Sequence, residues 1–447
     1  MHFPRPIHLC LLAAALALPA CQKPAPPPGA RVELEYWDKW TGFEADAMRA
    51  VVDDFNASQD RIHVNYSSIS QIDHKLMLAT AGGVPPDVAG VYSWMLSVYA
   101  ENNALTPLDR MAAAARITRG QYIDVFWRMC MHQGHLWALP STPSSTALIW
   151  NKKLFRQAGL DPNQPPRSIA ELEAFNQKLT KWRPDGSLQS MGYIPEMPGY
   201  WDSLWGLWFG ASLWNGRDAL TANSPENIAA CQWIESYPKR FGVRNLLMFQ
   251  AGFGNLASPQ NPFFTGRVAM EMEGVWVYNY IKNYAPADFE WGAAPFPTVD
   301  PARLKDVALV EMDALVIPAG SKHSAEAFEF IQYVESQKNM EKLCLGQRKF
   351  SPLLECSAEF YQKHPNPYIS NFVALAKSAN ARYAPPLTNW TQYSHDMNNA
   401  VNRIWTGKAD TLDALDDVQQ REQQIFERRM ARWQRLAPAL TAQWNNQ

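Results

Sequence analysis

Two pairs of carboxylates stand at alternate positions in apolar, strand-like segments. Glu271 and Glu273 form one pair, and Glu311 and Asp313 form the other. Residues two apart in a strand point to the same side, and a glycosidase needs two facing carboxyl groups about 5 to 10 Å apart. Such pairs also occur often by chance. The sequence contains no G-x-S-x-G, H-E-x-x-H, P-loop or G-x-G-x-x-G motif. We therefore expect a protein that binds a ligand and does not transform it.

Histidine and cysteine are the other residue types that could bind a metal or take part in redox chemistry. His132 and His135 have the spacing of metal ligands, but they fall at a predicted hairpin and lack a third ligand nearby. We therefore expect no metal and no other cofactor. The cysteines in the body of the chain either pair, Cys344 with Cys356 being nearest in sequence, or stay as buried thiols, which we prefer for so long a chain. They are Cys130, Cys231, Cys344 and Cys356.

The segment from Phe263 to Trp276 has the pattern of a turn, a short apolar strand, a glycine turn at Gly274 and the start of a helix. Trp276 is expected in the first turn of that helix. A strand that runs into a helix leaves free backbone N–H groups and a ring at one edge of an α/β sheet, where small polar ligands bind. The alternative is a core segment with a buried tryptophan.

Composition favours a carbohydrate over a nucleic acid as the ligand. Charged residues make up 19% of the chain and the net charge is −2, so no basic stripe exists to neutralise phosphates. Aromatic residues reach 12%, with 18 tryptophans, which exceeds what ordinary cores need. A sugar presents an apolar ring face that stacks on Trp or Tyr, and hydroxyls that pair with planar polar side chains.

The N-terminus indicates export and attachment to a membrane. Residues 1–20 carry one early arginine and an apolar run too short to span a bilayer, as in a secretion signal. The small residue before Cys21 resembles the lipobox of bacterial lipoproteins, which implies that Cys21 is lipidated and becomes the mature N-terminus. Residues 21–30 are rich in proline and should form an extended tether.

More than 400 residues follow this tether, which predicts two lobes. Alternating strand and helix patterns indicate right-handed βαβ units and a mainly parallel sheet. Small residues around 141–145 suit a crossing between the lobes, and Ser168 should cap a helix with Glu171 as its capping-box partner. We expect strands at 32–37, 61–67, 87–91 and 311–318, helices at 46–56, 73–81 and 324–336, and two helices after 391 that are separated at 406–408.

Several motifs, in this order and spacing, resemble the extracellular solute-binding proteins of bacterial ABC importers, in particular the sugar-binding group that includes maltodextrin binders. These motifs are Trp37-Asp38-Lys39-Trp40, the turn at 83–88, Trp150-Asn151-Lys152, Ala158-Gly159-Leu160, the set Phe263, Gly266, Ala269, Met270, Gly274 and Trp276, and Trp390. Where many members of the group place a charged sugar contact, this chain has Tyr92-Ser93-Trp94. That departure suggests a saccharide held more by rings than by carboxylates.

The resemblance implies a two-lobe periplasmic-binding-protein fold of type II, with two mainly parallel sheets joined by hinge strands. It implies an N-lobe of residues 31–141 plus 310–350 and a C-lobe of residues 142–309 plus 351–447. The protein would act outside the cytoplasm as a monomeric, membrane-anchored lipoprotein. It would close on a neutral di- or oligosaccharide and deliver it to a permease.

Candidate ligand contacts are rings and polar groups at expected loop edges and at positions matching the family. Trp205 could equally be helix core, and Arg348 could reach the cleft or merely cap a helix. The candidates are Trp37, Trp40, Tyr92, Trp94, Ser144, Trp201, Trp205, Glu273, Gly274, Trp276, Asp313, Arg348, Asn389 and Trp390.

Two other functions remain open at this point. A sugar or polyol phosphate such as glycerol 3-phosphate would need converging cationic side chains and helix N-termini. The expected loops are poor in lysine and arginine, which favours the neutral saccharide. A structural lipoprotein would instead present its tryptophans on a convex exterior.

Overall fold

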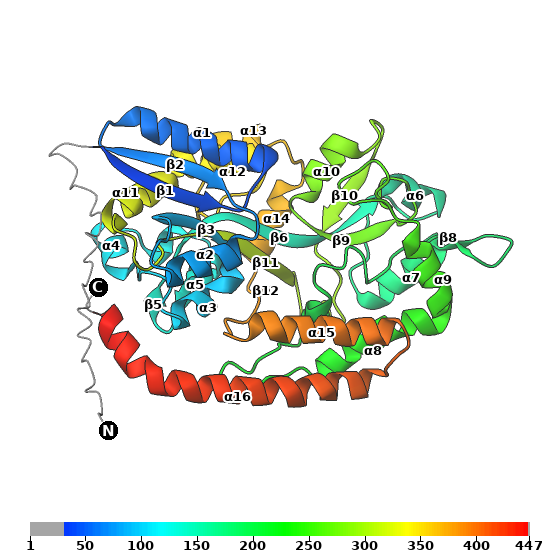
Figure 1. The fold of residues 1–447 in the computed structure, drawn as a ribbon. Coiled ribbons are helices and arrows are strands. Elements are labelled where there is room, and N and C mark those ends of the chain that lie inside the picture. Colours follow the sequence, from blue (N-terminus) through cyan, green and yellow to red (C-terminus); the bar gives the residue numbers. More distant parts are fainter. Residues whose placement is uncertain (1–30, 446–447) are drawn as a thin grey trace, which may run out of the picture.

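The computed structural model describes residues 31–445. The predicted signal peptide and the whole predicted tether, with Cys21, lie outside the described residues. Within residues 31–445, none of the helices combines the length and the apolar character needed to cross a membrane. The chain forms two α/β lobes that lie side by side, with long strands running from one to the other (Figure 1).

The first lobe begins with two βαβ units, as the alternating pattern predicts. Strand β1 (Val32–Asp38) pairs in parallel with β2 (Ile62–Ser68) and with β3 (Val88–Tyr92). Helices α1 (Gly42–Ser58) and α2 (Ile72–Ala81) make the crossovers. Apolar residues of α1 at helical spacing, from Ala45 to Phe55, are buried.

Two long strands connect the lobes. Strand β6 (Leu139–Asn151) runs antiparallel to β11 (Ala308–Val316), whose register shifts between Met312 and Ala314. The small residues around 141–145, which the sequence predicts at the crossing, lie inside β6, which is continuous and buried throughout. The crossing between lobes is therefore an extended strand with small side chains.

The sheet is mixed, so the expectation of mainly parallel sheets is wrong for the second lobe. Strands β9 (Met270–Gly274) and β10 (Trp291–Ala294) both pair antiparallel to the second half of β6. Strand β6 enters this lobe as one continuous strand, and β9 and β10 run along its two edges in the opposite direction. Parallel pairing is found between β1 and its two neighbours and between β11 and β12 (Ala381–Arg382).

Shorter elements complete the two lobes. The expected cap of α7 (Ile169–Leu179) is half confirmed, because the Ser168 side chain accepts from the Glu171 N–H, while the Glu171 carboxylate accepts from the backbone N–H of Arg167 and not from that of Ser168. The remaining elements up to residue 284 are η1 (Ser93–Met95), α3 (Leu96–Glu101), α4 (Asp109–Ala114), η2 (Arg119–Gln121), α5 (Asp124–Cys130), β4 (Met131–His132), β5 (His135–Leu136), α6 (Lys152–Gln157), α7 (Ile169–Leu179), β7 (Lys181–Trp182), β8 (Leu188–Ser190), η3 (Asp202–Phe209), α8 (Pro225–Phe241), α9 (Val243–Ala251) and α10 (Val277–Tyr284).

The C-terminal part is helical, and its two last helices confirm the predicted break. It consists of α11 (Ser324–Glu335), α12 (Gln337–Gln347), α13 (Ala358–Lys363), α14 (Ile369–Ala376), α15 (Trp390–Trp405) and α16 (Thr411–Trp444). Helix α16 runs beneath both lobes and curves upward at its C-terminal end (Figure 1). In the first half of α16, the Gln423 side chain accepts a hydrogen bond from the backbone N–H of Leu220 in the second lobe. Trp444 donates to Asn103 at 3.0 Å and packs edge-on against Trp137, both in the first lobe.

The cysteines and the histidine pair have ordinary structural surroundings. Cys130, Cys231, Cys344 and Cys356 are free thiols, three of them buried and Cys356 half-buried, and no disulfide joins Cys344 to Cys356. His132 lies 2.9 Å from a Glu101 carboxylate oxygen, and His135 lies 3.2 Å from one of Asp109.

Candidate binding site

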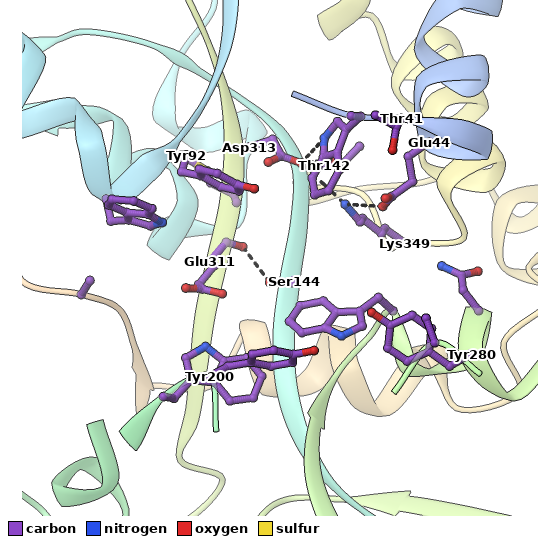
Figure 2. A pocket seen from close by; sticks show the side chains of 18 of the residues that line it. Thr41, Glu44, Tyr92, Thr142, Ser144, Tyr200, Tyr280, Glu311, Asp313 and Lys349 are labelled. Atoms are coloured by element: carbon purple, nitrogen blue, oxygen red, sulfur yellow. Dashed lines mark hydrogen bonds and ion pairs between the residues drawn. The ribbon is translucent and has the colours of Figure 1, made fainter. Parts of the chain in front are cut away.

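A cavity of about 790 Å³ lies where the two lobes meet, and both lobes contribute to its wall. Strand ends, the crossing strands, α10 and α15 contribute residues to its lining. Figure 2 shows side chains of this lining from close by. Its lining comprises Trp40, Thr41, Gly42, Phe43, Glu44, Tyr92, Trp94, Thr142, Ser144, Tyr200, Trp201, Ser203, Leu204, Ala257, Trp276, Asn279, Tyr280, Asn283, Tyr284, Glu311, Met312, Asp313, Lys349, Ala384, Trp390, Thr391, Ser394 and Asn398.

Aromatic rings from both lobes make up much of the wall. In the first lobe, Tyr92 and Trp94 stack with their ring centroids 5.5 Å apart and their planes inclined by 12°. In the second lobe, Trp201 and Trp276 lie 5.8 Å apart. Rings that approach from opposite lobes can hold the two faces of a flat, weakly polar ligand.

Trp276 occupies its place because Gly274 has no side chain. Strand β9 ends at Gly274, and Trp276 is the N-cap of α10, as the turn pattern predicts. A Cβ at position 274 would lie 2.3 Å from carbons of the Trp276 ring, so only glycine admits this packing. The buried Glu273 carboxylate accepts the Gly274 N–H at 3.0 Å, and burial raises the pKa of Glu273 to about 8.

Asp313 is the centre of a buried charge cluster in the wall of the cavity. Its carboxylate lies 2.8 Å from Lys39 Nζ and 3.6 Å from Lys349 Nζ. It also accepts from Trp40 Nε1 at 3.0 Å and from Thr142 Oγ1 at 2.7 Å. Burial alone would raise the pKa of this carboxyl, but the two lysines outweigh burial and hold the pKa below its ordinary value.

Both lysines of this cluster are neutralised by carboxylates. Lys349 lies 3.1 Å from Glu44, and Lys39 lies 3.8 Å from Asp38 in addition to its contact with Asp313. Lys349 Nζ also stands 4.1 Å from the centre of the Trp40 ring, which orients that indole. The prediction that the site is poor in lysine is therefore incomplete, because Lys349 lines the cavity and Lys39 lies behind the wall, each with a carboxylate partner.

Glu311 projects from β11 into the cavity. Ser144 donates to its backbone carbonyl at 3.4 Å, so the carboxylate itself is left for other partners (Figure 2). Burial raises the pKa of Glu311 to about 7, although a hydrogen bond from Trp201 opposes the shift. Its neighbour in the predicted carboxylate pair, Asp313, is bound to lysines.

Arg348 bridges the lobes at the rim of the site. It ends α12 with a left-handed backbone (φ 57°), and its guanidinium donates to Asn279 of α10 at 3.0 Å. The same group lies 5.1 Å from the centre of the Phe43 ring. Arg348 therefore ends the helix, and it contacts two residues that line the cavity without lining the cavity itself.

The structure brings eight of the predicted residues together in the cavity wall: Trp40, Tyr92, Trp94, Ser144, Trp201, Trp276, Asp313 and Trp390. The other six lie behind or beside the wall. Trp37 packs partly buried against the core, while Glu273, Gly274 and Arg348 support neighbouring residues. Asn389 is buried and donates to Glu422 at 3.1 Å.

Trp205 lies in the aromatic core of the second lobe and not in the cavity wall. Its ring packs 5.4 Å from Trp233, 5.5 Å from Trp208 and 5.6 Å from Phe296. Only 3% of its surface is exposed. The sequence left core packing open for this residue, and the structure places it there.

Several lining residues were not selected from the sequence, although some carried a signal. Asn279 and Tyr280 lie three and four positions after Trp276, which is one turn along the same helix face. Tyr200 adjoins Trp201, and Lys349 adjoins Arg348. Thr41, Glu44 and Thr142 had no distinguishing pattern, because only the fold brings them to the cavity.

Two lobes that share crossing strands and enclose an aromatic, polar cavity define a protein that captures a ligand between its lobes. The chain belongs to the bacterial extracellular solute-binding protein family, whose model matches residues 43–341. The family resemblance inferred from the motifs is thereby confirmed, and membership of an extracellular family agrees with the predicted export.

Individual relatives carry different ligands. The chain is similar to the solved structure of CpMnBP1 with mannobiose bound, with 26% identity, a TM-score of 0.77, and coverage of 87% of this chain and 99% of that chain. It is similar in fold to the sugar-binding protein MalE of Xanthomonas citri, at 19% identity, TM-score 0.72, and coverage of 90% and 99%. It is also 22% identical over 436 residues to the sn-glycerol-3-phosphate-binding periplasmic protein UgpB of Pectobacterium atrosepticum, covering 89% of this chain and 92% of that protein.

Proposed function

We propose that this protein is the solute-binding lipoprotein of an ABC importer and that it captures an unphosphorylated di- or oligosaccharide. The observation that carries this proposal is the set of rings from both lobes that face one cavity of about 790 Å³. This volume falls within the range of about 300 to 1,000 Å³ that small-molecule sites occupy. Trp94 from one lobe and Trp276 from the other supply stacking surfaces for more than one sugar ring.

Binding would couple to rotation of the lobes. Strands β6 and β11 cross between them, and rotation about such strands closes a cleft over its ligand. Polar groups of the wall, among them Asn279 and Ser144, would pair with sugar hydroxyls. The relative with mannobiose bound supports a saccharide of this size. No bond of the ligand is made or broken in this proposal.

A sugar or polyol phosphate is the second candidate, because relatives that bind sn-glycerol 3-phosphate match most of the chain. The charges in the wall argue against it. Among the described lining residues the ammonium group of Lys349 is paired with the carboxylates of Glu44 and Asp313, and Glu311 adds a third carboxyl group to the wall. A phosphate would therefore compete with carboxylates already paired to the lysines, and would meet Glu311 as a like charge.

Attachment to the membrane forms part of the proposal. Cys21 would carry the lipid, and residues 21–30 would hold the lobes away from the bilayer as a monomer that delivers its ligand to permease subunits. This part is supported by the leader, the cysteine and the proline-rich segment of the sequence.

A melting-shift screen tests the proposed ligand class. A saccharide that binds only the folded protein should raise the melting temperature, since binding stabilises by RT ln(1 + [L]/Kd). The screen should contain neutral disaccharides and trisaccharides together with glycerol 3-phosphate. A shift with glycerol 3-phosphate and with no saccharide would refute the proposal in favour of the second candidate.

Trp276→Ala tests the site itself. Loss of this ring should weaken binding of the saccharide found in the screen by about 1 to 3 kcal/mol, measured by calorimetry. Trp182→Ala is the matched control, because Trp182 is 46% exposed and stacks on Phe241 away from the cavity. Equal affinity of the two variants would show that Trp276 does not contact the ligand.

A further inference from the structure

Glu311 is a cavity carboxylate with no cationic partner among residues 31–445. The other two carboxylates of the wall are both paired, Glu44 with Lys349 at 3.1 Å and Asp313 with Lys39 at 2.8 Å. Lys349 lies 3.6 Å from Asp313 as well, so its charge is shared between two acids. The wall therefore keeps one carboxyl group without a counter-charge.

The surroundings of Glu311 leave its carboxylate open toward the ligand space. Ser144 contacts the backbone carbonyl of Glu311 and not the carboxylate. Figure 2 shows the carboxylate in the cavity between the ring of Tyr92 on one side and that of Tyr200 on the other. One donor, the Trp201 indole, contributes a hydrogen bond to it. An ionised carboxylate with two oxygens has capacity for further donors.

Aromatic faces next to an unpaired carboxylate suit a positive charge. The face of a Trp or Tyr ring is electron-rich and attracts a cation within about 6 Å of its centre. The wall already contains such contacts, since Lys39 Nζ lies 4.5 Å from the centre of the Tyr92 ring. Tyr92 stacks on Trp94, and Trp201 packs against Trp276, so rings from both lobes adjoin the space that Glu311 faces.

We propose that Glu311 selects a saccharide that carries a protonated amine, so that the preferred ligand is an amino sugar unit within the proposed di- or oligosaccharide. This inference rests on the proposed function. An ammonium on the sugar would donate a charge-assisted hydrogen bond to Glu311, which is about twice as strong as the neutral bond a hydroxyl would make. It would also neutralise a charge that is costly to leave unpaired in a partly buried site.

The test compares matched pairs of sugars that differ only in one amine. Calorimetry with glucosamine, galactosamine and mannosamine, each against its hydroxyl counterpart, covers the commonest arrangements around the ring. The amino form of at least one pair should bind the native protein about tenfold more tightly. If every hydroxyl form binds as tightly as its amino partner, the inference fails while the proposed saccharide function stands.

Glu311→Gln then assigns the preference to this residue. The variant keeps the size of the side chain and a hydrogen-bond acceptor but removes the charge. The advantage of the amino form should fall below about twofold. Glu290→Gln is the control, because Glu290 pairs with Arg156 on the surface, outside the cavity lining. A preference that persists in Glu311→Gln would overturn the assignment to this carboxylate.

The outcomes separate the two proposals. Binding of glycerol 3-phosphate without binding of any sugar would remove the proposed function and this inference together. The comparison of amino and hydroxyl sugars on the native protein needs no variant, so it holds even if Glu311→Gln fails to fold. Melting of each unliganded protein shows whether the variants fold.

Discussion

Asp313→Asn should destabilise the folded protein through the two lysines that this carboxylate holds. Asp313, Lys39 and Lys349 have side chains that are 8%, 6% and 5% exposed. Asparagine keeps the shape and can still accept from Trp40 or Thr142, but it removes the charge. Two buried ammonium groups then lose their shared partner.

The magnitude follows from the cost of breaking a buried ion pair. Removing one partner of such a pair costs about 3 to 5 kcal/mol, because the remaining charge stays buried without compensation. Asp38 and Glu44 stay beside the lysines in the variant. We therefore expect a loss at the lower end, about 3 kcal/mol in the free energy of unfolding.

The difference in stability between the native protein and the Asp313→Asn variant should depend on pH. The folded-state pKa of Asp313 lies below its ordinary value of 3.8, so its charge stabilises the fold fully above that value. This stabilisation is lost as the pH falls through the folded pKa, where the native carboxyl becomes protonated. The difference between native protein and variant should therefore be full at neutral pH and shrink as the pH falls below about 4.

Urea denaturation at several pH values measures this difference. Asp288→Asn is the control, since the Asp288 side chain is 77% exposed and its pair with Lys153 at 3.4 Å should matter little. If the Asp313→Asn variant is as stable as the native protein at neutral pH, the reasoning is refuted. A loss of equal size at pH values well below 4 would also refute it.

Two more variants test the support of the site and the buried acids. Gly274→Ala should displace the Trp276 ring, whose carbons lie 2.3 Å from the added Cβ, and weaken saccharide binding by about tenfold in calorimetry. Gly120→Ala, which meets no atom within 4 Å, is its control, and equal affinities would contradict the packing described. Burial raises the pKa of Glu335 from 4.5 to about 8, so the folded protein holds a proton that the unfolded chain releases, and stability should fall as the pH rises between these values. Glu335→Gln, which can still accept from Tyr122, should flatten this part of the profile in urea denaturation, and an unchanged slope would refute the shift.

Local patterns account for what the sequence predicted well. Strand and helix periodicities gave the first βαβ units, and the turn at Gly274 gave the start of α10 with Trp276 at its N-terminus. The strand directions in the second lobe depend on how β9 and β10 meet β6, and no local pattern encodes that meeting.

The tryptophan-rich segment shows a second reason for the differences. Trp201 and Trp205 are four residues apart, which places them on one face of an α-helix. Residues 202–209 form a 3₁₀ helix instead, in which four residues turn the chain by about a third of a circle beyond one full turn. Trp201 therefore faces the cavity while Trp205 enters the core.

Long-range pairing explains the part of the site that the sequence could not predict. Trp40 and Asp313 meet in a hydrogen bond across 273 positions of the chain. Lys349 is neutralised by Glu44 and Asp313, which come from other elements. Residue types alone do not reveal which lysines near a site are free to bind an anion.

Helix α16 gives the molecule a second mechanical link, separate from the sheet. Its 34 residues correspond to a rod of about 50 Å. Gln423 binds the second lobe through Leu220, and Trp444 binds the first lobe through Asn103. Pro438, which lacks an N–H to donate, lies near the C-terminal end of the helix. For the lobes to separate, helix α16 must bend or the Trp444 indole must leave its contacts with Asn103 and Trp137. If the lobes rotate as proposed, removing the last few residues would shift the balance between open and closed forms without changing a residue that lines the cavity.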